Sequence, residues 1–422
     1  MSRDELRSPR IERLRTDVAV GVQDATARFW DECAERGAPL VEPIEEEPGF
    51  RLVTFVWRDE TGCAENVVVF GGPAVWWDIP GNAFEHVPGT DVWYRTYRVR
   101  ADMRGRYVIS PNDPMTPLPR EGTPEVTDRE KTFRPDPFNP KSLVLPKIAG
   151  DPVSVERRFS VLELPDCPPQ PWAAPREGVR AGTVRRVQFT SKIFDNTRRV
   201  WVHTPHGYEE SASSPYGLAV LLDGRIWAEV LPIAPTLDNL LDAERIPPLV
   251  TVLVDTLDFR TRARELTLNE DFPRMLAEEL LPWVRERWHV TDDPRRTLIQ
   301  GQSYGGLAAA FTALRIPHLF GNASIHSGSF WWAPVGTAEA ETEWVARQYA
   351  VADHRPVRFY LEIGLQEGPT MVPTSRHLRD VLEAKGNEVH YREYNGGHDA
   401  NCWRGGIADA LQLLTPTWGH DA

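Results

Sequence analysis

The sequence lacks the features of several large classes of protein. Its four cysteines are scattered and include no Cys-x-x-Cys pair, so they fit neither a zinc site nor a disulfide framework. No internal repeat is present, and no apolar run approaches the roughly 20 residues that a membrane-spanning helix needs. The net charge of −13 at pH 7 argues against generic nucleic-acid binding, which depends on a basic face. We therefore expect no nucleic-acid partner and no membrane insertion.

The N-terminal sequence, MSRDELRSPRIERLRTD, carries charges throughout and has no apolar stretch of the kind found in signal peptides. Together with the cysteine pattern, this predicts a cytoplasmic protein. The 422 residues, 41% of them hydrophobic and 26% charged, are typical of a globular protein long enough for two domains.

The first part of the chain predicts a helix followed by a small β-sandwich. Residues 10–37 place Ile11, Leu14 and Val18 at helical spacing. Short stretches rich in β-branched and aromatic residues then follow at 51–59, 65–72, 92–100 and 105–113. Glycine, proline and aspartate separate them, as in sandwiches. We expect an N-terminal β-sandwich domain, with its leading helix, over residues 1–150.

Prolines crowd the segment from Pro111 to Gly178, which is also too rich in tryptophan, phenylalanine and leucine for a free linker. We expect an ordered strap packed along both domains. Its last part, residues 151–182, is predicted to form the linker between them.

From residue 183 the pattern becomes that of an α/β protein. Residues 183–204 alternate like a hairpin, and near-continuous apolar strands are expected at 216–224, 248–255 and 296–302. Further strands are expected at 321–329, 357–364 and 388–398. Helical segments lie between them, including residues 270–288. This alternation predicts a mostly parallel sheet with helices on both faces, over residues 183–422.

A Gly-x-Ser-x-Gly motif lies between a predicted buried strand and a predicted helix, with Ser303 flanked by Gly301 and Gly305. In that context the motif is typical of a nucleophile elbow, a sharp turn that exposes the serine hydroxyl. The alternative is a structural turn in which Ser303 merely caps the helix. Side chains in place of the glycines would collide with the neighbouring strand and helix.

A nucleophilic serine needs a base and an acid to orient that base. His398 follows the last strand on a glycine-rich loop, which agrees with the serine, acid, histidine order of α/β-hydrolases. His326 is the alternative base. Glu367 lies just past a strand end and is the candidate acid. The other acids considered are Glu362 inside that strand, Asp399 beside the histidine and Asp380 on a helix.

An oxyanion hole requires two backbone N–H groups. Tyr304, directly after the nucleophile, would supply one. The loop LLDGRIW after an earlier strand offers the other at Gly224, Arg225 or Ile226.

Several long motifs resemble those of bacterial enterochelin (ferric enterobactin) esterases. They are LLDGRIWAE, DTLDFRTRARELTLNEDF, GQSYGGLAAAFTALRIPHLFGNASIHSGSFWW and GGHDANCWRGGIADAL. Upstream, GTDVWYRTYRVRADMRGRYVISPND and DPFNPKS are similar to the N-terminal domain of that family. The resemblance departs at His326, where a polar uncharged residue is expected, and over residues 333–356, which have no distinctive match.

The resemblance implies an α/β-hydrolase that cuts the ester (trilactone) backbone of a catecholate siderophore and so releases iron inside the cell. It implies Ser303 as nucleophile, His398 as base and Glu367 as acid, and it places Arg262, Arg264 and Glu265 at the mouth of the site. The siderophore could be cut in its ferric or its iron-free form. Because any iron would arrive as part of the substrate, we expect no metal site and no cofactor.

An anionic, aromatic substrate calls for arginines and aromatic walls. The candidate binding residues on loops near the catalytic strand ends are Arg225, Trp227, Arg260, Arg262, Arg264, Trp331, Trp332, Trp403 and Arg404. The alternative is that the tryptophans fill the core and the arginines pair with Asp258 and Glu265. Two other functions stay open: a glycan or feruloyl esterase, and a non-catalytic siderophore-binding protein.

Overall fold

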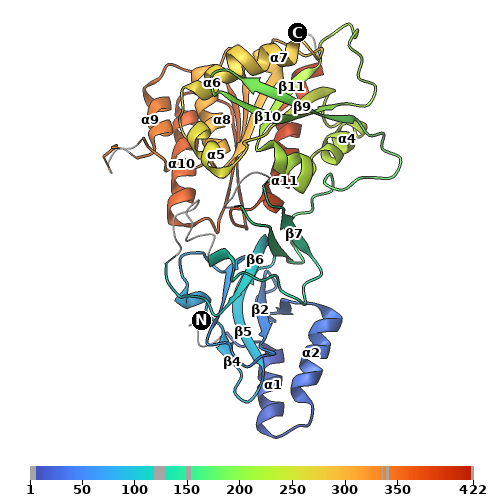
Figure 1. Ribbon diagram of the computed structural model, residues 1–422, viewed down its shortest axis with the longest axis vertical. Coiled ribbons are helices and arrows are strands. Elements are labelled where there is room, and N and C mark those ends of the chain that lie inside the picture. Colours follow the sequence, from blue (N-terminus) through green and yellow to red (C-terminus); the bar gives the residue numbers. More distant parts are fainter. Residues whose placement is uncertain (1–5, 118–128, 149–153, 335, 339–341, 420–422) are drawn as a thin grey trace. The chain divides into compact units, whose positions relative to one another are not determined.

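The computed structural model of the protein describes residues 6–117, 129–148, 154–334, 336–338 and 342–419 (Figure 1). The chain divides into two compact units, Met1–Pro168 with Asn395–Asp399 and Pro169–Tyr394 with Ala400–Ala422. The predicted strap includes residues 118–128 and 149–153, which lie outside the described residues.

The first unit begins with two helices where one was predicted, α1 (Pro9–Ala19) and α2 (Ala25–Arg36). The chain turns between them at Gly21 and Asp24, whose φ values of 72° and 59° lie in the left-handed region and end the helical path. Buried side chains from both helices, among them Leu14 and Phe29, share one apolar cluster.

Two antiparallel sheets complete the first unit. The first has the order β1-β2-β5-β4 and comprises β1 (Leu40–Pro43), β2 (Phe50–Arg58), β5 (Val92–Arg100) and β4 (Glu85–His86). The second has the order β3-β6-β8-β7 and comprises β3 (Val67–Gly71), β6 (Arg104–Pro111), β8 (Arg157–Glu163) and β7 (Ser142–Leu145). A short 3₁₀ turn, η2 (Pro80–Asn82), lies between β3 and β4.

Phe55 from the first sheet and Tyr107 from the second lie in the same buried cluster, which confirms the predicted sandwich. The predicted domain boundary is wrong, however. Strand β8 lies inside the expected linker, residues 151–182, and pairs with β6 and β7, so the N-terminal unit extends to Pro168.

An eight-stranded sheet forms the centre of the second unit, in the order β16-β15-β14-β13-β11-β12-β10-β9 (Figure 1). Its strands are β9 (Thr183–Ser191), β10 (Asn196–Thr204), β11 (Gly217–Leu222), β12 (Leu249–Val254), β13 (Thr297–Gln302), β14 (Asn322–His326), β15 (Arg358–Gly364) and β16 (Val389–Tyr394). Strands β12 to β16 run parallel with β11, while β9 and β10 form the predicted antiparallel hairpin.

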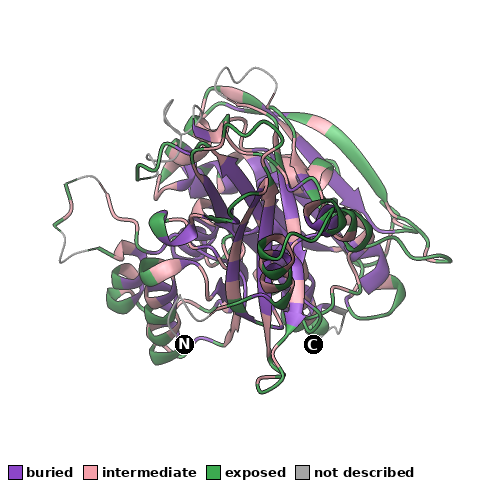
Figure 2. Cartoon of the chain, turned by 90° about the horizontal axis from the view of Figure 1, so that it is seen from below, coloured by how far each residue is buried: buried purple, intermediate pink, exposed green. Residues whose placement is uncertain are grey.

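Helices pack on both faces of this sheet. They are α4 (Ala234–Asp242), α5 (Phe259–Leu266), α6 (Asp271–Met275), α7 (Leu281–Arg285), α8 (Tyr304–Arg315), α9 (Trp344–Val351), α10 (Gly368–Ala384) and α11 (Ala400–Leu414). Shorter turns are η3 (Ile226–Val230), η4 (Leu276–Leu280), η5 (Pro294–Arg296) and η7 (Pro416–Gly419). Helix α8 packs with α5, α6 and α9, and α11 packs with α4. Buried residues are concentrated in the strands, as Figure 2 shows.

The helix predicted over residues 270–288 is divided into α6, the π-type turn η4 and α7. The Leu281 N–H donates to the Leu276 carbonyl, five residues back, and Pro282 has no N–H to continue the regular pattern. The segment nevertheless has an apolar face, because Leu276, Leu280 and Val284 are fully buried.

Candidate active site

Ser303 lies at the junction of β13 and α8 with φ 58° and ψ −122°, a conformation that is uncommon for a residue with a side chain. Its N–H donates to the His326 carbonyl at 3.0 Å, and its own carbonyl accepts from the N–H groups of Leu307 and Ser329. The side chain makes no capping hydrogen bond to the helix. The local geometry is therefore that of a nucleophile elbow, and the helix-cap alternative does not hold.

Close backbone contacts explain the glycines of the motif. A Cβ at Gly301 would lie 2.1 Å from the Gly305 carbonyl oxygen, and one at Gly306 would lie 2.9 Å from the Gly328 Cα. At Gly305 the nearest atom, Asp223 Oδ2, would be 3.3 Å away. The collision predicted from the sequence thus applies severely to Gly301 and only mildly to Gly305.

The predicted oxyanion loop follows β11, the strand that pairs directly with β13. A Cβ at Gly224 would lie 2.6 Å from the Leu253 backbone, so only glycine allows this close approach to β12. The Ile226 N–H donates to the Asp223 carbonyl at 2.9 Å. Gly224 and Arg225 therefore remain the candidates for the second oxyanion N–H, beside Tyr304 at the start of α8.

Glu367, the predicted acid, lies between the end of β15 at Gly364 and the start of α10 at Gly368, and is only 8% exposed. Its Oε1 accepts hydrogen bonds from the Ser327 hydroxyl at 2.5 Å, the Gly364 N–H at 2.9 Å and the Tyr394 hydroxyl at 3.3 Å. Burial and then the Glu367 charge raise the pKa of Tyr394 well above its usual value, so the tyrosine keeps the proton that it donates. The acid is held by a buried set of donors.

The alternative base and one alternative acid are paired with each other. His326 is completely buried, with Nδ1 2.7 Å from Glu362 and Nε2 2.9 Å from the Ser324 hydroxyl. Tyr360 also donates to Glu362, at 2.9 Å. Both ring nitrogens of His326 are therefore engaged within the sheet. Asp380 lies on α10, where Arg379 pairs with it.

His398 belongs to the segment Asn395–Asp399, which groups with the first unit. In that segment the Asn395 side chain donates to Asp102 at 2.7 Å, and the Asn395 carbonyl accepts from the Arg104 N–H at 3.2 Å. Ser303 belongs to the second unit, and its pairing with His398 stays a prediction.

Two of the predicted aromatic walls are buried instead. Trp227 is 0% exposed, and its Nε1 lies 3.3 Å from Gln302 Oε1. Trp403 is 7% exposed and donates to the Ser327 hydroxyl at 2.8 Å. Neither side chain is therefore the exposed aromatic wall that the sequence led us to expect, and a part for either in substrate binding stays a prediction.

Arg262 is also engaged within the protein. Its Nε and Nη2 donate to the two carboxylate oxygens of Asp223 at 2.6 and 2.8 Å, and Nη2 donates to the Gln302 carbonyl at 3.1 Å. Arg404 likewise donates from Nε and Nη2 to Gln170. Both guanidinium groups are therefore hydrogen-bonded within the protein, and a substrate-binding role for either stays a prediction.

The remaining binding candidates are more accessible. Arg260, Arg264 and Trp331 are exposed, while Arg225 and Trp332 are half-buried. The expected pairing of arginines with Asp258 and Glu265 is only partly present. Asp258 caps α5 by accepting from Thr261, whereas Glu265 pairs with the buried Arg198 at 2.8 Å and with Arg264 at 3.7 Å.

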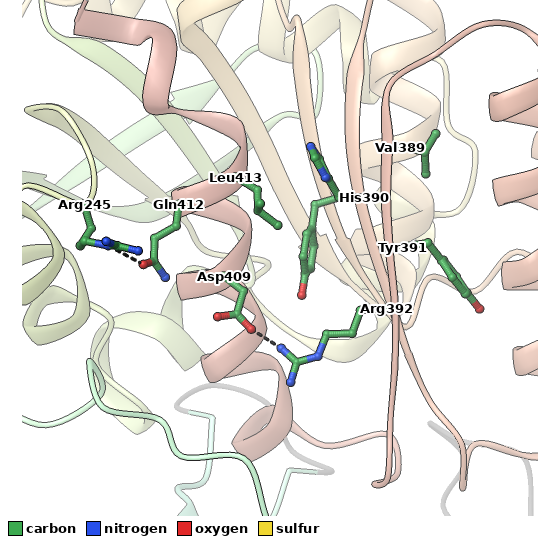
Figure 3. A pocket seen from close by; sticks show the side chains of 9 residues that line it. Arg245, Val389, His390, Tyr391, Arg392, Asp409, Gln412 and Leu413 are labelled. Carbon is green, nitrogen blue, oxygen red and sulfur yellow. Dashed lines mark hydrogen bonds and ion pairs between the residues drawn. The ribbon is translucent and has the colours of Figure 1, made fainter.

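A separate open groove of about 660 Å³ lies beside β16 and α11 (Figure 3). Arg392 pairs there with Asp409, and Arg245 donates to Gln412. None of the predicted site residues lines this groove.

Within the described residues, no cluster of three or more His, Cys, Asp or Glu side chains could hold a metal ion. The described residues form no helix that is long and apolar enough to cross a membrane.

An elbow at the carboxyl ends of a mostly parallel sheet, with an antiparallel hairpin at one edge, defines this chain as an α/β-hydrolase. The sequence profile described as "Putative esterase" matches residues 191–414, and the profile "Enterochelin esterase, N-terminal" matches residues 52–173. The chain belongs to the enterobactin esterase family, a family of carboxylic-ester hydrolases.

Relatives match nearly the whole chain. The iron(III) enterobactin esterase of Dickeya dadantii is 31% identical over 92% of both chains. The iron(III) salmochelin esterase of an Escherichia coli O6:H1 strain is 29% identical, over 96% of this chain and 97% of its own. The enterobactin esterase of Shigella flexneri, crystallised in the presence of enterobactin, is 29% identical with a TM-score of 0.72 and covers 92% of this chain and 97% of its own.

Proposed function

We propose that this protein is a serine esterase that hydrolyses the trilactone or related ester backbone of a catecholate siderophore, iron-loaded or iron-free. The observation that carries the substrate class is the match of both halves of the chain to enterobactin esterases, the N-terminal profile included. A feruloyl esterase would account for the catalytic fold but not for that N-terminal match. We also propose that iron release takes place in the cytoplasm.

The proposed reaction is acyl transfer to Ser303. His398, oriented by Glu367, takes the proton from the Ser303 hydroxyl as the oxygen attacks the ester carbonyl. The backbone N–H of Tyr304 and that of Gly224 or Arg225 hold the oxyanion, and the positive end of α8 adds to this stabilisation. His398 then protonates the leaving alkoxide, and water hydrolyses the acyl-enzyme with His398 again as base.

The accessible candidates for holding an anionic, aromatic ligand are fewer than the sequence suggested. Arg225, Arg260 and Arg264 supply guanidinium groups that can both donate hydrogen bonds and stack, and Trp331 and Trp332 supply ring surface. This smaller set is the proposed binding surface of the second unit.

Chromatography of the products from a ferric tris-catecholate trilactone tests the proposal. The wild type is expected to produce linear trimer, dimer and monomer in steps, and Ser303→Ala to bind without cleaving. Ser213→Ala is the matched control, because Ser213 is an exposed serine of the same unit. Turnover by Ser303→Ala would overturn the assignment of Ser303 as the nucleophile.

Two further outcomes would overturn the substrate class. Binding without cleavage by the wild type would indicate a siderophore-binding protein. Neither binding nor cleavage, with activity on feruloylated xylan, would indicate a glycan esterase. Cell fractionation with detection of the chain tests the cytoplasmic location.

A further inference from the structure

The Asp223 carboxylate lies beside the elbow, with Oδ2 3.3 Å from the position that a Cβ on Gly305 would take. Asp223 is 6% exposed and precedes the predicted oxyanion loop. Its Oδ1 accepts from Arg262 Nε and from the Thr256 hydroxyl at 3.0 Å, while its Oδ2 accepts from Arg262 Nη2 and from Gln302 Nε2 at 2.7 Å. Four hydrogen bonds thus converge on this one side chain.

The Arg262 guanidinium joins the two segments that would form the oxyanion hole. It donates two parallel hydrogen bonds to the Asp223 carboxylate, a geometry that fixes both the distance and the relative orientation of the two groups. The same Nη2 donates to the Gln302 carbonyl, which belongs to the peptide bond leading into Ser303. The guanidinium also lies 5.6 Å from the centre of the Tyr304 ring.

We propose that Arg262 is a positioning residue that sets the separation of the two oxyanion N–H groups. One of these groups follows Asp223 within two residues, and the other, that of Tyr304, follows Gln302 within two residues. These segments follow neighbouring strands, β11 and β13, whose paired residues end at Leu221 and Gln300 in the described part of the chain. Arg262, carried by α5, links the two segments through its hydrogen bonds to Asp223 and to the Gln302 carbonyl, and the Gln302 side chain adds a direct hydrogen bond to Asp223.

This role differs from substrate binding. The Arg262 side chain is only 17% exposed, and its Nε and Nη2 already donate to protein acceptors. A displacement of about 1 Å at a catalytic group can lower the rate on the order of 100-fold. Loss of Arg262 should therefore lower kcat for every ester, whether or not the substrate is charged.

The test compares Arg262→Gln, Arg262→Lys and Asp223→Asn on two substrates, an uncharged p-nitrophenyl ester and the ferric trilactone. Arg262→Gln is expected to lower kcat on the order of 100-fold on both, with little change in KM. Arg262→Lys should restore part of kcat, because an ammonium can reach Asp223 but cannot reproduce the bidentate fork. The double variant Arg262→Gln, Asp223→Asn should lose little more than either single variant.

Arg358→Lys is the matched control. Arg358 makes a similar bidentate pair with Glu388, at 2.9 and 2.8 Å, but lies at the start of β15, whereas the elbow follows the end of β13. The kcat of Arg358→Lys should equal that of the wild type. If circular dichroism shows that Arg262→Gln does not fold, Thr256→Val tests the positioning role in its place. It removes one donor from the same carboxylate and should lower kcat by a smaller factor.

A rise in KM for the ferric trilactone alone, with kcat on the neutral ester unchanged, would overturn the proposal and make Arg262 a ligand contact. A lower KM in Asp223→Asn would do the same, since that change releases the guanidinium. The inference rests on Ser303 as the proposed nucleophile. The neutral ester separates its failure from a failure of the siderophore assignment, because the kcat comparison does not require the siderophore to be a substrate.

Discussion

Replacing Gly301 by alanine should disrupt the elbow more than any other single methyl addition in the motif. The new Cβ would lie 2.1 Å from the Gly305 carbonyl oxygen and 2.9 Å from the Gly306 nitrogen. Ordinary contacts begin at 3.4 Å, so the first of these falls about 1.3 Å short. Both neighbours are backbone atoms at the start of α8, and neither can rotate away as a side chain would.

The strand or the helix must therefore move. Overpacking of this kind costs about 1–3 kcal/mol, and the backbone contact places Gly301→Ala at the upper end. For a unit of this size, about 3 kcal/mol corresponds to a fall in Tm of about 6–12 °C. A shift of about 1 Å at Ser303 would also lower kcat on the order of 100-fold.

Gly305→Ala provides the comparison for stability. Its Cβ would meet Asp223 Oδ2 at 3.3 Å, a mild contact, and alanine within a helix gains about 0.5–1 kcal/mol over glycine. Differential scanning calorimetry should therefore show a much smaller change than for Gly301→Ala. A Gly301→Ala protein with the Tm and kcat of the wild type would refute the reasoning.

Two other predictions concern buried polar groups. Ser327→Ala removes both the donor to Glu367 and the acceptor of the Trp403 indole, so urea unfolding should show a loss of about 1–3 kcal/mol; an unchanged midpoint would contradict this. Burial raises the pKa of the Asp136 carboxyl to about 6, above its unfolded value, so its contribution to stability is present below about pH 4 and is lost as the pH rises through 6. Relative to Asp136→Asn, the wild type should lose about 3 kcal/mol across that range, and parallel stability curves for the two proteins would count against it.

Much of the second unit was predictable because its signals are local. Alternation over residues 183–204 and six further strand-like segments predicted all eight strands, and a turn between strand and helix predicted the elbow at Ser303. Both depend on residues within a few positions of one another, so no knowledge of distant contacts was needed. The same holds for the four strands predicted in the sandwich.

The first unit was less predictable where its elements are short or lie among prolines. Strand β4 has two residues, and β1 and β7 have four each, too few to show a period of two. Strand β8 follows a proline-rich stretch, which led to the wrong boundary at residue 150. Only pairing with β6 and β7 identifies it as part of the sandwich.

By itself, the sequence determined the family, the fold class and the nucleophile candidate, because contiguous motifs identify each of them. Only the tertiary structure decided which of the candidate arginines and tryptophans are buried and which are exposed. Arg262 donates to Asp223, which is 39 residues away along the chain, and Trp403 donates to Ser327, which is 76 residues away. A side chain's burial and partners depend on such distant pairs, which the folded sheet brings together and local spacing does not reveal.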